Sequence, residues 1–204
     1  MPQNDKMASD TRETAQSFLK CLTGRRSVSP KRLVAPGPTQ AEIETMIAAA
    51  VTAPDHRQLR PWRFILIADE ARTALSTLFQ SAKSRASPDA GPAELERERE
   101  RALRAPTLLA VVARLQRNEP RVEERDQYAS VGAAIQNILL AAHAMGYGAM
   151  MLSGRKTRDQ GLVTGLGLTG QEELLGFICL GTPTSSAPDK PRPKVADHLS
   201  IWRG

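Results

Sequence analysis

The first candidate for chemistry in this 204-residue chain is the tripeptide Arg25-Arg26-Ser27, which places two guanidinium groups beside a hydroxyl. Guanidinium forks bind phosphate oxygens through charge-assisted hydrogen bonds, and the hydroxyl adds a neutral donor. A second basic cluster lies near the C-terminal end, where Lys190 and Arg192 flank a proline that stiffens the segment. Taken alone, each cluster can also be a solvated surface segment. A phosphate site is therefore one interpretation, which the rest of the chain must support.

Other chemistries are limited by what the sequence lacks. Nucleophile-elbow, zinc-protease, P-loop and dinucleotide-binding glycine patterns are all absent. The three histidines, His56, His143 and His198, share no ligand spacing, and Cys21 and Cys179 have neither metal-ligand nor redox spacing. We therefore expect no metal site and no nucleophilic catalysis. Cys179 belongs to an apolar run and is predicted to be a small buried hydrophobic residue.

The overall charge would suit an anionic partner. The chain has 28 Lys and Arg against 22 Asp and Glu, a formal charge of +6 and a pI near 9.7. Along residues 94–101, however, acidic and basic residues mix at helical spacing, which is typical of a solvated helix face. With four Phe, two Tyr and two Trp, the chain offers few rings on which bases could stack. We therefore do not expect nucleic-acid binding.

A stretch without Asp, Glu, Lys or Arg, residues 127–154, is long enough to suggest a membrane span. Its glycines, amides and many alanines offer less apolar area than a span requires, so we expect a helix buried in protein instead. The first twelve residues lack the apolar centre of a secretory signal. The sequence therefore predicts no membrane association and a cytoplasmic location.

The elements that position these side chains follow from hydrophobic periodicity. Thr39 and Glu42 form a capping box, so the start of the helix that ends before Pro54 is well marked. The expected helices cover residues 11–22, 39–53, 69–84, 93–103, 123–145 and 156–166, and the expected strands cover 62–67, 107–112, 149–152 and 174–180.

This order predicts one α+β domain, in which a mixed sheet is flanked by helices around a central hydrophobic helix. We expect an N-terminal helix and tail in residues 1–23, the main domain in 24–181 and an extended arm in 182–204. The arm contains four prolines and ends in Ile201-Trp202, so it packs poorly on itself. We therefore expect the arm to cover its apolar end on a partner subunit, in a homodimer.

Six motifs in order indicate a family. They are Arg-Arg-Ser at 25–27, Ala-Pro-Asp-His at 53–56 leading to Pro-Trp and an apolar strand, Ala-Pro at 105–106 before the next strand, the small-residue helix ending in Gly-Tyr-Gly at 146–148, Ser-Gly at 153–154, and Leu-Gly-Thr-Pro at 180–183 before a basic tail. From residue 24 to about residue 194 the chain resembles the nitroreductase superfamily of flavin oxidoreductases, in particular its branch of small NAD(P)H nitroreductases.

The resemblance implies a nitroreductase-like fold, bound FMN and an intertwined homodimer with two flavin sites between the subunits. Carried over by position, Arg25 and Ser27 would hold the phosphate and the polyol, and Arg26 would face the same ribityl end. Lys190 and Arg192 would close over the phosphate from the tail. This agrees with the chemistry of a phosphate dianion, which needs cations at one end of its site.

The same resemblance implies a second set of residues at the ring. Thr52 and His56 would come from the partner subunit and line the pocket there. Met151, Leu152 and Ser153 would place backbone N–H groups near the flavin N5 and the ring oxygens, where reduction creates negative charge.

The implied reaction is a ping-pong transfer, in which NADH or NADPH reduces the flavin and leaves before a nitroaromatic, a quinone or a related electrophile takes its place. No catalytic side chain is implied, because the chemistry occurs at flavin N5. Relatives often have Trp-Arg where this chain has Met151-Leu152, and Gln before the Pro-Trp where it has Arg60. If the first change disables hydride delivery, the alternative is a flavin-binding sensor or storage protein without turnover.

Overall fold

Helices and short strands alternate along the chain in the computed structural model, which describes residues 2–185, 187 and 189–204, with side chains from residue 12 onward. The helices are α1 (Pro2–Gly24), α2 (Gln40–Ala50), α3 (Arg72–Ala86), α4 (Pro92–Leu103), α5 (Glu124–Ala144) and α6 (Gln160–Gly165). The strands are β1 (Leu33–Val34), β2 (Trp62–Leu66), β3 (Thr107–Arg114), β4 (Gly148–Leu152) and β5 (Glu172–Pro183).

The strands form one sheet in the order β1-β5-β3-β2, and β4 also pairs with β5. Residue pairs such as Leu109↔Ile178 and Met151↔Ile178 fix the register of β3 and β4 on the two sides of β5. All four pairings among the described strands are antiparallel, where a mixed sheet was expected. Between β3 and β5 the chain forms α5, β4 and α6. This connection brings β5 back alongside β3 in the opposite direction.

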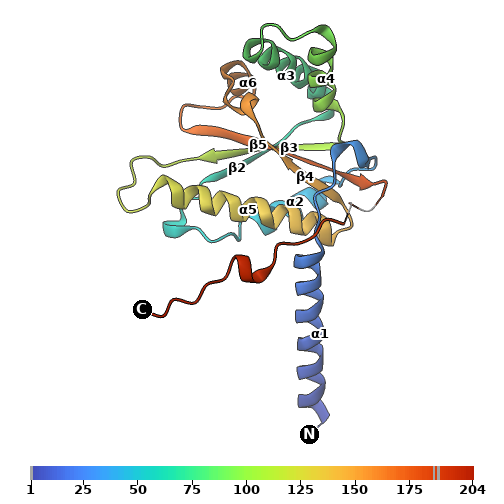
Figure 1. The fold of residues 1–204 in the computed structure, drawn as a ribbon, viewed down its shortest axis with the longest axis vertical. Coiled ribbons are helices and arrows are strands. Elements are labelled where there is room, and N and C mark those ends of the chain that lie inside the picture. Colours follow the sequence, from blue (N-terminus) through green and yellow to red (C-terminus); the bar gives the residue numbers. More distant parts are fainter. Residues whose placement is uncertain (1, 186, 188) are drawn as a thin grey trace.

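Helices cover both faces of the sheet, with α2 and α5 on one side and α3, α4 and α6 on the other (Figure 1). Side chains of β3 alternate between the two layers, since successive residues of a strand point to opposite faces. Leu109 and Val111 join the core beneath α5, whereas Ala110 and Val112 join the core beneath α3. The α+β class and the helix-flanked sheet predicted from the sequence are confirmed.

Helix α5 lies across one face of the sheet (Figure 1). Val131, Ala134 and Ile138 are fully buried against the sheet, whereas Ala133 and Ile135 are only partly buried in the single chain. The described helices include none that is both long enough and apolar enough to cross a bilayer. The uncharged stretch therefore serves as a core helix, as predicted, and its outer side retains apolar surface.

Element boundaries agree with the sequence where a local signal marks them. The capping box of α2 is present, with the Thr39 hydroxyl accepting from the Glu42 N–H and the Glu42 carboxylate accepting from the Thr39 N–H at 2.8 Å. Helix α1 begins nine residues before the predicted Thr11, because proline is tolerated at the first helical position and no breaker follows before Gly24. Strand β5 extends to Pro183, two residues into the expected arm, and there it pairs with β1, a strand too short to predict.

Helix α1 and the C-terminal arm both project from the body of the molecule (Figure 1). The arm is irregular apart from a turn at Val195–Asp197. Its apolar side chains are exposed in the single chain, with Ile201 at 74% and Trp202 at 89%, and Phe18 on α1 is exposed at 62%. The apolar end of the arm therefore has no cover among the described residues of one subunit, and its expected packing on a partner stays a prediction.

Candidate functional site

The segment that follows α1 lies along the outer edge of β4. The Val28 N–H donates to the Ala149 carbonyl at 2.9 Å, which fixes this segment to the strand. Gly148 permits the close approach, because a Cβ atom there would come within 2.6 Å of a Leu33 methyl group. Arg25 to Ser27 are thereby held at the start of β4.

Five of the predicted site residues line one cleft of about 590 Å³, named the basic cleft here. Its lining residues are Arg25, Arg26, Ser27, Ser29, Lys31, Arg32, Met150, Lys190, Pro191, Arg192 and Pro193. The structure thus brings together two clusters that are more than 160 residues apart in sequence. Lys31 and Arg32 were missed, although their position four and five residues after Ser27 was a visible signal.

Arg25 provides the clearest sign that the basic cleft receives an anion. Its Nη1 atom is buried and has no hydrogen-bond partner. Two other arginine nitrogens among the described residues share this property, Arg72 Nη1 and Arg99 Nε, but neither residue lines the cleft. A buried cationic donor without a partner is costly, so a bound anion would stabilise Arg25 strongly.

The arm is attached to the cleft through its own arginine. Arg192 Nη2 donates to the carbonyl oxygens of Thr23 at 2.8 Å and Arg25 at 2.7 Å. Arg26 forms an ion pair with Asp189 at 3.0 Å, which ties the next stretch of the arm to the same place. The two segments therefore place their cations around one cleft before any ligand arrives.

A second cavity of about 310 Å³, named the central cavity here, continues from the basic cleft along β4. The two share Ser29, Lys31 and Met150 as lining residues. Phe79 and Phe177 form an apolar wall of the central cavity, with ring centroids 5.1 Å apart in an edge-to-face arrangement. A ligand with an anionic end and a flat apolar end would match the two spaces in sequence.

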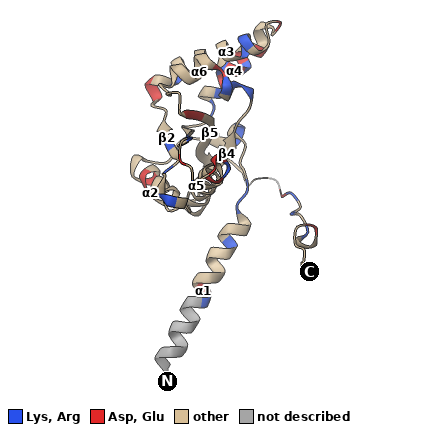
Figure 2. Ribbon diagram, turned by 90° about the vertical axis from the view of Figure 1, so that its left-hand side faces the viewer, with Lys and Arg blue, Asp and Glu red and all other residues tan. Residues whose placement is uncertain are grey.

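Charged residues from α4 and the turn after β4 line the far side of the central cavity. Lys156 Nζ lies 3.8 Å from the Phe79 ring centroid and 3.0 Å from Glu98 Oε2, and Arg101 pairs with the same carboxylate. Burial lowers the pKa of Lys156, although Glu98 opposes the change. Both signs of charge alternate along α4 (Figure 2), but Glu98 is only 12% exposed. The prediction that α4 presents a solvated face is therefore wrong at Glu98, because α3 and Lys156 cover this residue.

The predicted ring-end residues lie at the end of β4. Leu152 and Ser153 line the central cavity together with Met150, whereas the Met151 side chain packs toward the core beneath α5. Gly154 follows with φ +143, a conformation that favours glycine, and a Cβ atom there would meet nothing within 4 Å. The backbone is therefore open at this point, as an approaching planar group requires.

Thr52 and His56 lie apart from these cavities in the single chain. Both follow α2 and are exposed, and the Thr52 hydroxyl donates to the Ala49 carbonyl at 2.8 Å. Asn137 of α5 donates to the same carbonyl at 3.0 Å and so holds the end of α2 in place. The expected contribution of Thr52 and His56 from a partner subunit stays a prediction.

The residues present fit FMN by their chemistry. Cations and an unpartnered guanidinium nitrogen surround the basic cleft, and the apolar central cavity follows it directly. A phosphate, a polar chain and a ring system in that order need this succession of environments.

Comparison with known proteins gives a consistent picture. A model of the nitroreductase family matches residues 22–182. The "Putative NAD(P)H nitroreductase YdjA" of Escherichia coli (strain K12) is 32% identical over 169 residues, which cover 83% of this chain and 90% of that protein.

Solved structures agree on the fold. A nitroreductase-like family protein from Bacillus cereus superposes with a TM-score of 0.78 at 22% identity, over 92% of this chain and 96% of that one. A nitroreductase from Desulfovibrio desulfuricans, solved in complex with FMN, gives a TM-score of 0.69 at 22% identity, over 92% and 98%.

The burial of Cys179 in the wall of the central cavity predicts an unreactive thiol. Burial raises its pKa to about 11, so little thiolate forms near neutral pH. In a Cys21→Ser variant, we expect no labelling by a thiol reagent at about pH 8 in the native state and full labelling after denaturation. A Cys179→Ser variant provides the control for Cys21. Rapid native labelling of Cys179 would show that the cavity wall is open to solvent.

Proposed function

The chain belongs to the nitroreductase family, and from this premise we propose that it is an FMN-dependent oxidoreductase that takes electrons from NADH or NADPH. The name of the E. coli relative includes NAD(P)H, and the D. desulfuricans structure contains FMN. Both properties are proposed here for this chain. The acceptor is proposed to be a nitroaromatic, a quinone or a related electrophile.

The observation that carries this proposal is the buried, unpartnered Nη1 of Arg25 at one end of a continuous space. Arg25, Arg26, Ser27, Lys190 and Arg192 would bind the FMN phosphate, since they line the basic cleft from two segments. An anion there would give the Arg25 nitrogen the acceptor it lacks.

The ring system is proposed to occupy the central cavity and the end of β4. Backbone N–H groups near Ser153 would face the developing charge, and Phe79 and Phe177 would exclude water from the inner side. When bound, FMN supplies hydride acceptance and release, so the chain itself need only bind, orient and shield. This agrees with the lack of an acid–base constellation in the sequence.

A homodimer is proposed from the uncovered apolar surface. Val195, Leu199, Ile201 and Trp202 on the arm are all at least 69% exposed, and Phe18 on α1 is 62% exposed. Single subunits rarely expose apolar residues together in this way, so a second copy of the chain is the cover that the arm requires. The same partner would bring Thr52 and His56 to the flavin ring.

The proposed activity predicts that the purified protein is yellow, and that NADH or NADPH bleaches its flavin absorbance under anaerobic conditions. Stopped-flow absorbance measures the bleaching, and addition of a nitroaromatic or a quinone should restore the colour. A yellow protein that neither nucleotide bleaches would indicate a flavin-binding sensor or storage protein. A colourless protein that takes up no added FMN would refute the proposal.

Removal of the Arg25 guanidinium should weaken FMN binding. Loss of one charge-assisted phosphate contact predicts an increase in the FMN dissociation constant of about tenfold to a hundredfold in Arg25→Ala. Arg97→Ala, an exposed arginine on α4, is the charge-matched control and should bind FMN normally. Titration of the apoprotein with FMN measures both. Equal affinity of the two variants would remove Arg25 from the site.

Removal of the apolar end of the arm should weaken the dimer while leaving the arm cations in place. A chain that lacks residues 195–204 keeps Lys190 and Arg192, and we expect it to be monomeric or aggregated in light scattering after size exclusion. Truncation after residue 185 removes the cations as well, and should also lose the flavin. If both truncated chains stay dimeric and yellow, the arm has neither role.

A further inference from the structure

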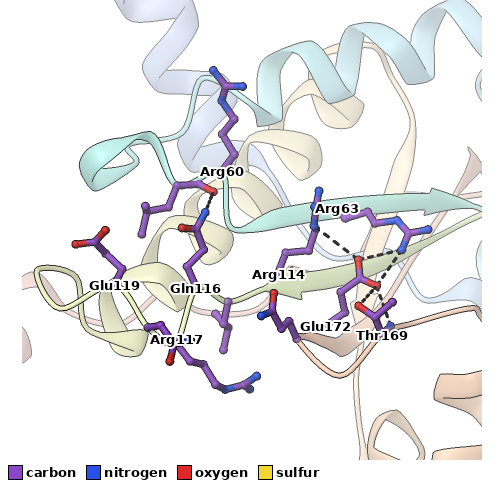
Figure 3. A pocket seen from close by; sticks show the side chains of 12 residues that line it. Arg60, Arg63, Arg114, Gln116, Arg117, Glu119, Thr169 and Glu172 are labelled. Carbon is purple, nitrogen blue, oxygen red and sulfur yellow. Dashed lines mark hydrogen bonds and ion pairs between the residues drawn. The ribbon is translucent and has the colours of Figure 1, made fainter.

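A cleft that none of the predicted site residues line lies at the start of β2 and the end of β3, with a volume of about 810 Å³. We name it the arginine cleft, because Arg60, Arg63, Arg114 and Arg117 line it together with Glu119 and Glu172 (Figure 3). Its residues come from three stretches of the chain: the loop before β2 with the start of β2, the end of β3 with the loop after it, and the turn before β5 with the first residue of β5. Four guanidinium groups in one concave surface require an explanation beyond solvation.

Glu172 organises two of these arginines and has no capacity left for others. Its side chain is 6% exposed and accepts hydrogen bonds from Arg63 at 2.9 and 3.0 Å and from the Thr169 N–H at 3.0 Å. Arg114 Nε lies 3.8 Å from the same carboxylate (Figure 3). Burial favours a higher pKa for Glu172, but these hydrogen bonds outweigh it and the pKa is lowered. One anion therefore positions two cations.

The remaining charges leave the cleft positive. Arg117 is neutralised by Glu173 and by Glu124, the latter at 3.4 Å. Glu119 is partly neutralised by Arg57, which lies 3.9 Å away and does not line the cleft. Within the part of the chain that the structure describes, no carboxylate lies within ion-pair distance of the Arg60 guanidinium. Arg60 and one of the two arginines on Glu172 are thus uncompensated.

The wall that carries Arg60 is held in an unusual backbone conformation. Arg57, Gln58 and Arg60 have φ values of 64, 53 and 50, in the region that favours glycine. The Asp55 carboxylate accepts from the Arg60 N–H at 2.7 Å and so maintains this shape. Non-glycine residues persist in such conformations only where the surroundings impose them, and they are common at ligand sites.

A second contact joins this wall to the opposite one. Gln116 Nε2 donates to the Leu59 carbonyl at 3.1 Å, across the cleft from β3 to the loop before β2. The buried Gln127 fixes Gln116 by accepting from its N–H at 2.8 Å and donating to its carbonyl at 3.1 Å. The arginine cleft is therefore built before a ligand binds.

The arginine cleft is connected to the end of β4 through a neighbouring cleft of about 780 Å³. Glu172 lines both, and the neighbouring cleft also includes Ser153, Gly154 and Arg155. The two clefts share Glu172, so the proposed ring end of the flavin and the uncompensated arginines line adjoining spaces. A long ligand that reacts at one end and is anionic further along would fit them.

We propose that the arginine cleft binds the phosphate groups of the reducing dinucleotide while its nicotinamide lies at the end of β4. This inference rests on the proposed function for the identity of the ligand, whereas the positive charge and shape of the cleft are independent of it. Arg60 and Arg114 would provide charge-assisted hydrogen bonds to phosphate oxygens, and Arg63 would hold Arg114 in place through Glu172.

The first test compares Arg60→Ala and Arg114→Ala with the Arg97→Ala control. Anaerobic stopped-flow reduction gives the apparent dissociation constant for NADH and NADPH. We expect an increase of about tenfold for each cleft variant and none for the control. In the variants, the affinity for the dinucleotide should also rise less steeply as the salt concentration falls. Unchanged dissociation constants in both variants, with normal bleaching, would overturn the inference and leave the proposed function intact.

The second test needs no flavin chemistry. Calorimetry with ADP and with 2′,5′-ADP measures binding of the phosphate part alone, and we expect Arg114→Ala to weaken it by about tenfold. A preference for 2′,5′-ADP would identify NADPH as the reductant. If the wild-type protein binds neither nucleotide, and Arg114→Ala instead raises the KM for a nitrobenzoate but not for nitrobenzene, the cleft serves an anionic acceptor and the inference is wrong.

Discussion

The buried Nη1 atom of Arg25, which has no hydrogen-bond partner among the described residues, is the constraint on which the proposed anion site depends. A cation with a buried, unpartnered nitrogen destabilises the fold unless an anion completes it. Among the described residues no carboxylate pairs with Arg25, and the arm instead brings Lys190 and Arg192 to the same cleft, where Arg192 uses its own donors on backbone carbonyls. The positive charge of this cleft therefore supports the proposal of an anionic ligand.

The sequence predicts the parts of this structure that local chemistry determines. The capping box at Thr39 and the alternation along β3 are local signals, and both are present. The position of Glu98 could not be read in this way, because i,i+3 spacing with Arg101 describes an exposed helix and a covered one equally well. Its burial depends on Lys156, 58 residues further along the chain.

Only part of the candidate site could be predicted from the sequence, for a related physical reason. The resemblance to the nitroreductase superfamily grouped Arg25 with Arg192 around one phosphate, and the fold does bring them together. The arginine cleft could not be predicted, since its residues come from three separate stretches of the chain and one buried carboxylate holds two of its arginines. Thr52 and His56 belong to a further class, because a single subunit cannot test residues expected to act across an interface.

The distribution of charge in space distinguishes the classes of anion that a net charge of +6 alone leaves open. A polymer such as nucleic acid requires cations along an exposed face, but the highly charged helix α4 alternates both signs (Figure 2). Cations instead line two recesses, the basic cleft and the arginine cleft, with the open end of β4 between them. Recessed cations favour small anionic ligands over a polymer. A flavin and its nucleotide reductant would be two such ligands, and their reactive ends would meet at the end of β4.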